Sequence, residues 1–258
     1  MTKFLKREYE KLVPDNFKAA LEQATYFAEK SDINIYLIGG IVRDLVLNNS
    51  IHDIDITVQG DAVEFCRQVE SKSDFKIISV QENLRTAKVI FNSDVIIDFA
   101  STRKEHYLSG GILPSIDSFG CSLENDVKRR DFTINTLAVS MTGTDKFSLI
   151  DFYNGYEDIK NKKIRILHDK SFIDDPSRIV RAIKFQMRFD FDIEEKTEEL
   201  MNNYLNNVDN SIPLERIKNE LRQYFNIEKQ GIYENLIKKN VYKLICNNPV
   251  KNFNSNLF

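Results

Sequence analysis

The residues that could do chemistry begin where an apolar strand runs into paired glycines. Residues 36–44 read YLIGGIVRD, in which Gly39 and Gly40 precede a short apolar helix that carries Arg43. Paired glycines at a helix start let the backbone approach an anion, and the exposed N–H groups and the helix dipole favour phosphate there. This segment therefore predicts a phosphate-binding turn, with Arg43 one helical turn along.

Two carboxylates follow at strand spacing. Asp53 and Asp55 flank Ile54, and side chains alternate along a strand, so both carboxylates can point to the same side. Carboxylates that close repel one another unless a hard cation lies between them, and Mg²⁺ prefers such oxygens together with substrate phosphates. Taken alone, such a pair is more often a solvated strand edge than a metal site. Asp98, in the strand sequence VIIDFA, is a further carboxylate in an apolar strand, and taken alone it could be a buried and paired Asp.

A basic helix lies further along the chain. Asp175 before Pro176 is typical of a helix N-cap followed by the first turn. Arg178, Arg181 and Lys184 then recur every three residues, which places them on one side of the helix. Taken alone, this pattern is most often a capped and solvated helix.

The elements that must position these residues follow from hydrophobic periodicity. We expect helices over 17–28, 41–47 and 62–69, and strands over 35–38, 54–58, 75–80, 87–91 and 95–99. Residues 92–94 predict a hairpin turn, and residues 103–115 predict a flexible loop. Beyond about residue 156 the pattern is helical, without a convincing strand.

This shift predicts an α+β chain of more than one domain. We expect a catalytic head with a small mixed β-sheet over residues 1–150, an all-α neck over 151–227, and a short helical body segment over 228–258. The joint is expected near residues 151–166, and the Asn-rich end, 247–258, is expected to fray.

Composition limits the class of protein. The 258 residues are 42% hydrophobic and 29% charged, with no apolar run of membrane-spanning length, and the charged start predicts neither a signal peptide nor an anchor. We therefore expect a soluble, cytoplasmic protein. Its three cysteines are far apart, which predicts buried free thiols rather than disulfides or zinc ligands. The net charge is −3, but residues 160–188 hold nine basic and three acidic residues, a stripe that could hold a polyphosphate or an RNA backbone.

Several motifs in order resemble one family. The GGIVRD and DID segments resemble the nucleotidyltransferase head of the class II tRNA nucleotidyltransferase (CCA-adding enzyme) and bacterial poly(A) polymerase family. Residues 128–138 (KRRDFTINTLA) are similar to its RRDFTINALA motif, and 151–165 to its interdomain motif. Residues 175–185 resemble its base-recognition motif, although Lys184 replaces the usual Arg and Asp174 the usual Glu, and 215–220 resemble its ERxxxE motif.

The resemblance implies roles for single residues. It implies that Asp53, Asp55 and Asp98 bind two Mg²⁺ ions and carry out catalysis. A larger set would bind the nucleotide. Those residues are Gly39, Gly40, Arg43, Arg130, Asp131, Asp175, Arg178, Arg181 and Lys184. Among them, Asp175 and Arg178 would pair with the Watson–Crick edge of CTP or ATP, and Arg181 and Lys184 would bind phosphates.

The resemblance also implies the reaction, which is addition of C and/or A to the 3′ end of tRNA from CTP and ATP with release of pyrophosphate. Poly(A) polymerase activity is the alternative. An RNA-binding module without catalysis, an antibiotic nucleotidyltransferase and a phosphohydrolase of the HD type have less support. The family continues through helical body and tail domains that grip tRNA. We therefore expect either that the sequence is a fragment, or that a reduced body, a homodimer or a partner provides that grip.

Overall fold

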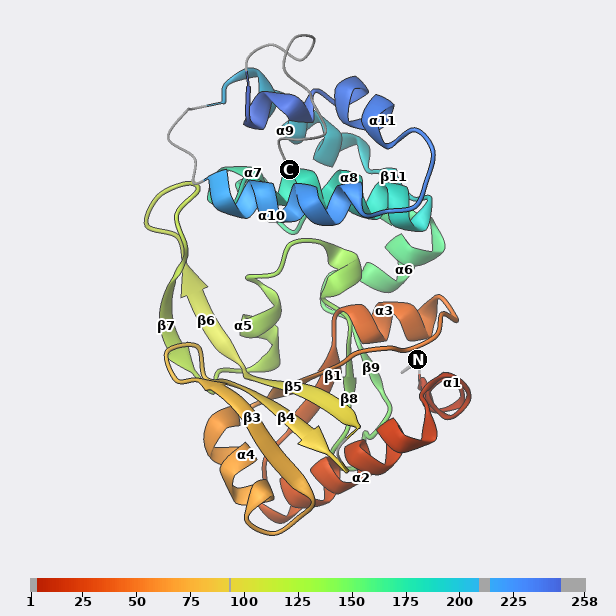
Figure 1. The fold of residues 1–258 in the computed structure, drawn as a ribbon, viewed down its shortest axis with the longest axis vertical. Helices are drawn as coiled ribbons and strands as arrows, with labels where there is room; N and C mark the ends of the chain where they lie inside the picture. Colours follow the sequence, from red (N-terminus) through yellow and green to blue (C-terminus); the bar gives the residue numbers. More distant parts are fainter. Residues whose placement is uncertain (1–3, 93, 209–213, 247–258) are drawn as a thin grey trace. The chain divides into compact units, whose positions relative to one another are not determined.

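The computed structural model describes residues 4–92, 94–208 and 214–246. The chain divides into two compact units. The first comprises residues 1–106 and 116–159, and the second comprises 107–115 and 160–258 (Figure 1). The division after residue 159 lies inside the joint expected at 151–166, but nine residues beyond the predicted end of the head at 150. The predicted body segment, 228–258, belongs to the second unit.

The first unit is built on a seven-stranded mixed sheet in the order β3-β4-β5-β2-β1-β8-β9. Its strands are β1 (Ile35–Ile38), β2 (Ile54–Val58), β3 (Phe75–Gln81), β4 (Thr86–Phe91), β5 (Val95–Ser101), β8 (Ala138–Ser140) and β9 (Leu149–Ile150). The β2 and β5 strands run parallel, and β1 runs antiparallel to both of its neighbours. The mixed α+β head predicted from the sequence is confirmed.

Helices accompany this sheet. They are α1 (Lys6–Leu12), α2 (Asp15–Lys30), α3 (Gly40–Val46), α4 (Ala62–Glu70), α5 (Leu123–Val127), the 3₁₀ turn η1 (Thr133–Asn135) and α6 (Gly155–Lys160). The Asp61 carboxylate caps α4 by accepting from the backbone N–H groups of Val63 and Glu64. The α4 helix packs on β3, β4 and β5, and α2 packs on α4 and β5, so one face of these strands is covered (Figure 1).

Alternating burial shows which face forms the core. In β5, Val95, Ile97 and Phe99 are buried, whereas Ile96 and Asp98 between them are exposed. Phe99 packs against Phe65 of α4, with ring centroids 5.9 Å apart. The opposite face of β5 is therefore open to solvent, as a strand with one buried face requires.

The prediction of a loop over residues 103–115 is wrong at both ends of that range, because residues 103–106 and residue 115 belong to strands. A separate two-stranded sheet pairs β6 (Arg103–His106) with β7 (Ser115–Phe119). Residues 107–115 group with the second unit, where the backbone N–H of Gly111 donates to the carbonyl of Asp174 at 3.1 Å. All four side chains of β6 are charged or titratable, so this strand lacks the apolar residues from which the other strands were predicted.

The second unit is mainly helical. Its elements are α7 (Ser171–Asp174), α8 (Ser177–Phe189), α9 (Glu195–Asn206), α10 (Leu214–Phe225), α11 (Ile232–Lys238) and the 3₁₀ turn η2 (Val241–Leu244). Two short strands, β10 (Lys163–Ile164) and β11 (Asp192–Ile193), pair in parallel. The expectation of no strand beyond residue 156 is therefore wrong, because a two-residue pairing is too short to leave a period in the sequence.

Two smaller expectations can also be compared with the structure. Of the three thiols predicted to be buried, Cys66 is buried, whereas Cys121 and Cys246 are half-buried. None of the helices in the described ranges is long and apolar enough to span a bilayer. Ser93 in the predicted hairpin turn and the Asn-rich residues 247–258 lie outside the described residues.

Candidate functional site

Two of the predicted carboxylates of the first unit lie on neighbouring strands at the centre of the sheet. Asp55 of β2 lies directly opposite Asp98 of β5 in the parallel register. Both are exposed, while their strand neighbours Ile54 and Ile97 are buried, so the two carboxylates stand on the open face of the sheet. Asp53 is also exposed and lies one residue before β2 begins.

Asp55 lies near the carboxylates of Asp98 and Asp53, so repulsion between like charges affects its ionisation. Although the Asp55 side chain reaches the surface, the surrounding protein partly desolvates its carboxylate, and this raises the pKa of Asp55. The Asp98 and Asp53 carboxylates raise it further, and Arg130 and Lys88 oppose the rise. Lys88 of β4 lies opposite Asp98, and its Nζ is 3.1 Å from Asp98 Oδ2. The Lys88 ammonium group thus already forms an ion pair with one of the three carboxylates.

These carboxylates have the donor chemistry of a Mg²⁺ site, because hard oxygen ligands and a repulsion that a cation relieves favour such an ion. Within residues 4–92, 94–208 and 214–246, however, no three His, Cys, Asp or Glu side chains converge closely enough to hold a metal ion.

A strained turn connects β1 to α3 as the glycine motif predicts. Gly39 has φ +73°, and its N–H donates to the carbonyl of Leu137 at 3.0 Å. A Cβ at this residue would lie 3.3 Å from Arg130 Nη1 and 3.5 Å from the carbonyl of Asn135. Both the backbone conformation and the close guanidinium therefore require glycine. Gly40 begins α3, where a Cβ would lie 3.7 Å from Arg43 Nη2.

Arg43 and Asp131 belong to one buried network. Arg43 Nη1 donates to Asn135 Oδ1 at 2.9 Å, and Asn135 Nδ2 donates to Asp131 Oδ1 at 3.0 Å. Arg43 also pairs with Asp44 at 3.0 Å. We did not single out Asn135 from the sequence, although it lies in the KRRDFTINTLA segment. The Asn135 amide bonds to Arg43 and Asp131 and so orients both predicted nucleotide-binding residues. Asn135 would therefore affect nucleotide binding indirectly, through these two residues.

A second buried carboxylate holds Arg130. Asp126 is fully buried, with one oxygen 3.2 Å from Arg130 Nη2 and the other 2.9 Å from Arg129 Nη2. Burial alone would raise the pKa of Asp126, but Arg130 and Arg129 reverse this effect and lower it. Arg130 Nε is buried without a hydrogen-bond partner among the described residues. Sequence analysis missed Asp126, whose signal would have been its place four residues before Arg130.

In the second unit, Asp175 is held at the start of α8. The Asp175 Oδ1 atom accepts from the Ser177 backbone N–H at 3.1 Å and from Ser177 Oγ at 2.6 Å. Its Oδ2 accepts from Arg216 Nη2 of α10 at 2.5 Å. Asp175 is extended and Pro176 is helical, so the predicted capping role is present although the helix is assigned from Ser177.

Arg178 lies beside Asp175 and is almost fully buried. Its Nη1 donates to Ser171 Oγ at 2.7 Å, and its Nη2 donates to the Tyr107 hydroxyl at 3.3 Å. Arg178 Nε lies 4.0 Å from Asp175 Oδ2. These contacts fix the orientation of both predicted base-reading side chains.

The two predicted phosphate-binding cations share an acidic partner. Arg181 Nη1 lies 3.1 Å from Glu220 Oε1, and Lys184 pairs with the other oxygen of Glu220. Lys184 also donates to Gln223 Oε1 at 2.7 Å. A phosphate that used either cation would have to compete with Glu220. The predicted residues thus form two groups, one in each unit.

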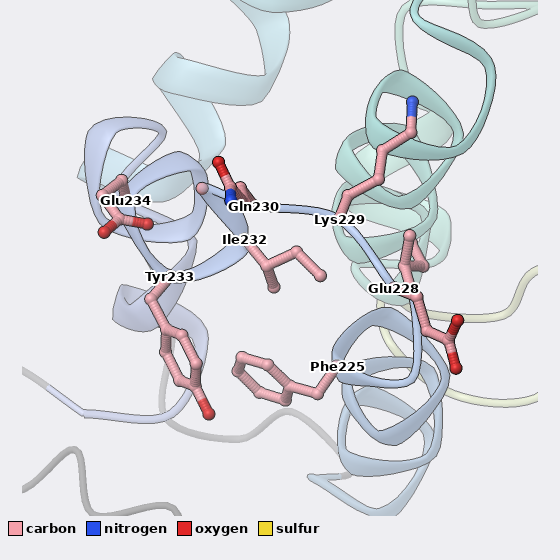
Figure 2. Close-up of a pocket in the computed structure, with 9 residues that line it drawn as sticks. Phe225, Glu228, Lys229, Gln230, Ile232, Tyr233 and Glu234 are labelled. Carbon is pink, nitrogen blue, oxygen red and sulfur yellow. The ribbon is translucent and has the colours of Figure 1, made fainter.

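A cavity of about 760 Å³ lies elsewhere in the second unit, where α10 turns into α11. Phe225 and Tyr233 both line it, and their rings stack with centroids 5.0 Å apart (Figure 2). None of the predicted site residues lines this cavity, and its aromatic pair belongs to the packing between these helices.

Comparison with known proteins finds one family model and several relatives that match this chain. The poly A polymerase head domain family matches residues 35–165. An A-adding tRNA nucleotidyltransferase of Geobacter sulfurreducens is 39% identical over 185 residues, which are 72% of this chain and 21% of that protein. The solved structure of a CCA-adding enzyme in an apo form superposes with a TM-score of 0.85 at 31% identity, covering 95% of this chain and 57% of that one.

A Thermotoga maritima CCA-adding enzyme, solved in complex with tRNA, superposes with a TM-score of 0.75 at 29% identity. The superposition covers 95% of this chain and 55% of that one. The chain therefore spans about a fifth of the length of the Geobacter protein and little more than half of the solved chains.

Proposed function

This chain belongs to the poly A polymerase head domain family, and from that premise we propose that it is a nucleotidyltransferase that adds C and/or A to the 3′ end of tRNA. The observation that carries the proposal is the placement of Asp55 opposite Asp98 inside the matched segment, in the same unit as the Gly39 turn. Relatives named for A-addition and for CCA-addition support tRNA as the acceptor.

The reaction proposed is an in-line displacement. The terminal 3′-hydroxyl of the tRNA attacks the α-phosphorus of CTP or ATP, a new P–O bond forms, and the bond to the β-phosphate oxygen breaks so that pyrophosphate leaves. The hydroxyl proton passes to a carboxylate or to water. Arg43 and Arg130 supply positive charge beside the Gly39–Gly40 turn and would orient the triphosphate.

Asp53, Asp55 and Asp98 would hold two Mg²⁺ ions, which when bound neutralise the carboxylates and polarise the phosphate. Desolvation is the largest cause of the raised pKa of Asp55, and repulsion from Asp98 and Asp53 adds to it. This added repulsion supports the assignment, because it is what a divalent cation relieves. Release of Lys88 from Asp98 would accompany it.

In the second unit, Asp175 and Arg178 would read the base. A carboxylate accepts from the exocyclic amine of C or A, and a guanidinium donates to the neighbouring ring nitrogen or carbonyl. Ser177, Ser171 and Tyr107 hold the two side chains in fixed orientations, which supports a role in selection. Such pre-organised polar groups reject a base that would leave them unpaired.

The test is nucleotide addition with defined acceptors. Transfer RNAs that end before the first C, after the first C and after the second C of the CCA end are incubated with CTP or with ATP. Incorporation into one or more of them supports the proposal and shows which of CCA, CC or A addition occurs. Incorporation of ATP into unstructured RNA in preference to every tRNA would instead identify a poly(A) polymerase. Asp55→Asn serves as the inactive control.

A further inference from the structure

The open face of β3, β4 and β5 carries two rows of side chains that run toward the carboxylates. In the first row, Ser79 lies opposite Lys88, Lys88 opposite Asp98, and Asp98 opposite Asp55. In the second row, Lys76 lies opposite Ile90, and Ile90 opposite Ile96. Because the rows are two residues apart along β4 and β5, they stand on the same face.

This face has a composition unlike that of an ordinary solvated sheet. Ile96 is 47% exposed and Ile78 is 51% exposed. Ile90 is half-buried and lies between Lys76 of β3 and Ile96 of β5, and Lys88 is two residues before it on the same face of β4. Helices α2 and α4 cover the other face of these strands, and Ile78 lies at the bulge between Ile77 and Ser79. We define Lys76, Ile78, Lys88, Ile90 and Ile96 as the β3–β5 platform.

The direction of the proposed in-line displacement indicates which substrate would lie on this platform. The Gly39–Gly40 turn, Arg43 and Arg130 lie on the β1 side of the carboxylates, so the leaving pyrophosphate departs toward β1. In an in-line reaction the attacking hydroxyl enters opposite the leaving group. Within this unit, the side opposite β1 is β4 and β3.

We infer that the β3–β5 platform binds the last nucleotides of the acceptor RNA, with the lysines on phosphates and the isoleucines against sugar and base. This inference rests on the proposed function and names the surface that delivers its acceptor. Neighbouring strands are about 4.8 Å apart, so the platform extends about 10 Å from Asp98 across β4 to β3. Charge complementarity favours a phosphodiester chain, and Lys88 joins the platform directly to Asp98.

Two variants separate the charged from the apolar contribution. Lys88→Ala should raise the KM for tRNA about fivefold, and it should reduce the slope of log KM against log salt by about 0.7, the value for one phosphate contact in a single strand. Ile96→Ser should raise the KM for tRNA by about threefold without changing that slope. For both variants, the KM for CTP or ATP at saturating Mg²⁺ should stay within twofold of the original value.

Matched controls lie elsewhere in the same unit. Lys72→Ala removes an exposed lysine from the turn after α4, and Tyr26→Ser removes an exposed large side chain from α2. Neither should change the KM for tRNA. If the unmodified protein adds no nucleotide to tRNA, the proposed function fails. If it adds nucleotides while Lys88→Ala and Ile96→Ser behave like the controls, the platform inference alone fails. A change of oligomeric state in Ile96→Ser, with unchanged KM, would also overturn the inference by assigning the face to a second copy of the chain.

Discussion

Asp55 and Asp98 occupy the same register position on two parallel strands, so two negative side chains stand side by side on an open sheet face. This arrangement is unfavourable for the fold by itself, since the Asp98 carboxylate disfavours ionisation of Asp55. Natural sequences retain such local conflicts mainly where function needs them. The relationship therefore has consequences for stability as well as for activity.

Asp55→Asn is expected to abolish nucleotide addition and to stabilise the metal-free protein. Loss of a metal-binding carboxylate should remove several kcal/mol of transition-state stabilisation, which is about a thousandfold or more in kcat. The pKa of Asp55 is raised above its ordinary 3.8, so the folded state binds more protons than the unfolded state just above that pH. Stability due to Asp55 therefore falls as the pH rises through this window and stays lower at neutral pH.

Thermal unfolding with a chelator, measured from pH 3.5 to pH 7, checks this prediction. The Tm of Asp55→Asn should exceed that of the original protein at pH 7, and the difference should shrink toward acid. Added Mg²⁺ should raise the Tm of the original protein more than that of the variant. A variant that is less stable at neutral pH would show that Asp55 makes a favourable structural contact instead.

Asp126→Ala should be strongly destabilising. The substitution leaves Arg129 and Arg130 without the buried carboxylate that they share, and breaking a buried ion pair by removing one partner costs about 3–5 kcal/mol. Because the pKa of Asp126 is lowered, its contribution is complete above the ordinary value near 3.8 and is lost as the pH falls further.

Urea unfolding of Asp126→Ala gives the measurement, and Glu124→Ala gives the control. Glu124 pairs with Lys128 at 3.0 Å across an exposed helix face, where such pairs contribute less than about 1 kcal/mol. Nearly equal losses in the two variants would mean that Asp126 does not hold Arg129 and Arg130 as the contacts indicate.

Gly39→Ala should impair both the fold and triphosphate binding. A Cβ would force a residue with φ +73° into a strained conformation, at a cost of about 1–3 kcal/mol, and would press on Arg130 Nη1 at 3.3 Å. Gly143→Ala is the matched control, because Gly143 has φ +74° but nothing within 4 Å of its Cβ position.

Both variants should lower the free energy of unfolding, whereas only Gly39→Ala should raise the KM for CTP or ATP, by about tenfold for a displaced charged contact. Equal KM values in the two variants would separate Arg130 from nucleotide binding.

The parts that could be predicted from sequence are those with a strong local period. The strand at residues 35–38 and the helix at 62–69 match β1 and α4 to within one residue, because a continuous apolar run and a helical apolar period specify them locally. The β6–β7 hairpin and the β10–β11 pair were missed, since charged or two-residue strands carry no such signal. Tertiary context decides those elements.

The same distinction applies to the candidate sites. Spacing along one strand predicted that Asp53 and Asp55 share a face, because alternation along a strand is a local rule. The family resemblance, and not a local rule, singled out Asp98 on the neighbouring strand. The partners that orient the other residues, such as Asn135 for Arg43 and Tyr107 for Arg178, come from distant segments. A single sequence contains no pattern that links residues 92 or 71 positions apart.

Base choice is the prediction that depends most on these long-range partners. Asp175→Asn should lower kcat/KM for CTP and ATP far more than for UTP, because an amide placed against the exocyclic amine can present a donor to a donor, whereas uracil offers a carbonyl there. The variant keeps one oxygen that can accept from Ser177, so the start of α8 should survive, unlike in Asp175→Ala.

Single-nucleotide addition to tRNA with each of the four triphosphates measures this selectivity, while the KM for tRNA serves as an internal control. Arg216→Lys tests the alternative that Asp175 only anchors α10 to α8, since Arg216 Nη2 donates to Asp175 Oδ2 at 2.5 Å. A purely structural Asp175 would make Asp175→Asn and Arg216→Lys lose activity equally with all four triphosphates. Selective loss of CTP and ATP in Asp175→Asn, with unchanged selectivity in Arg216→Lys, would place base recognition on the carboxylate itself, because only that variant changes the hydrogen-bond polarity that a base encounters.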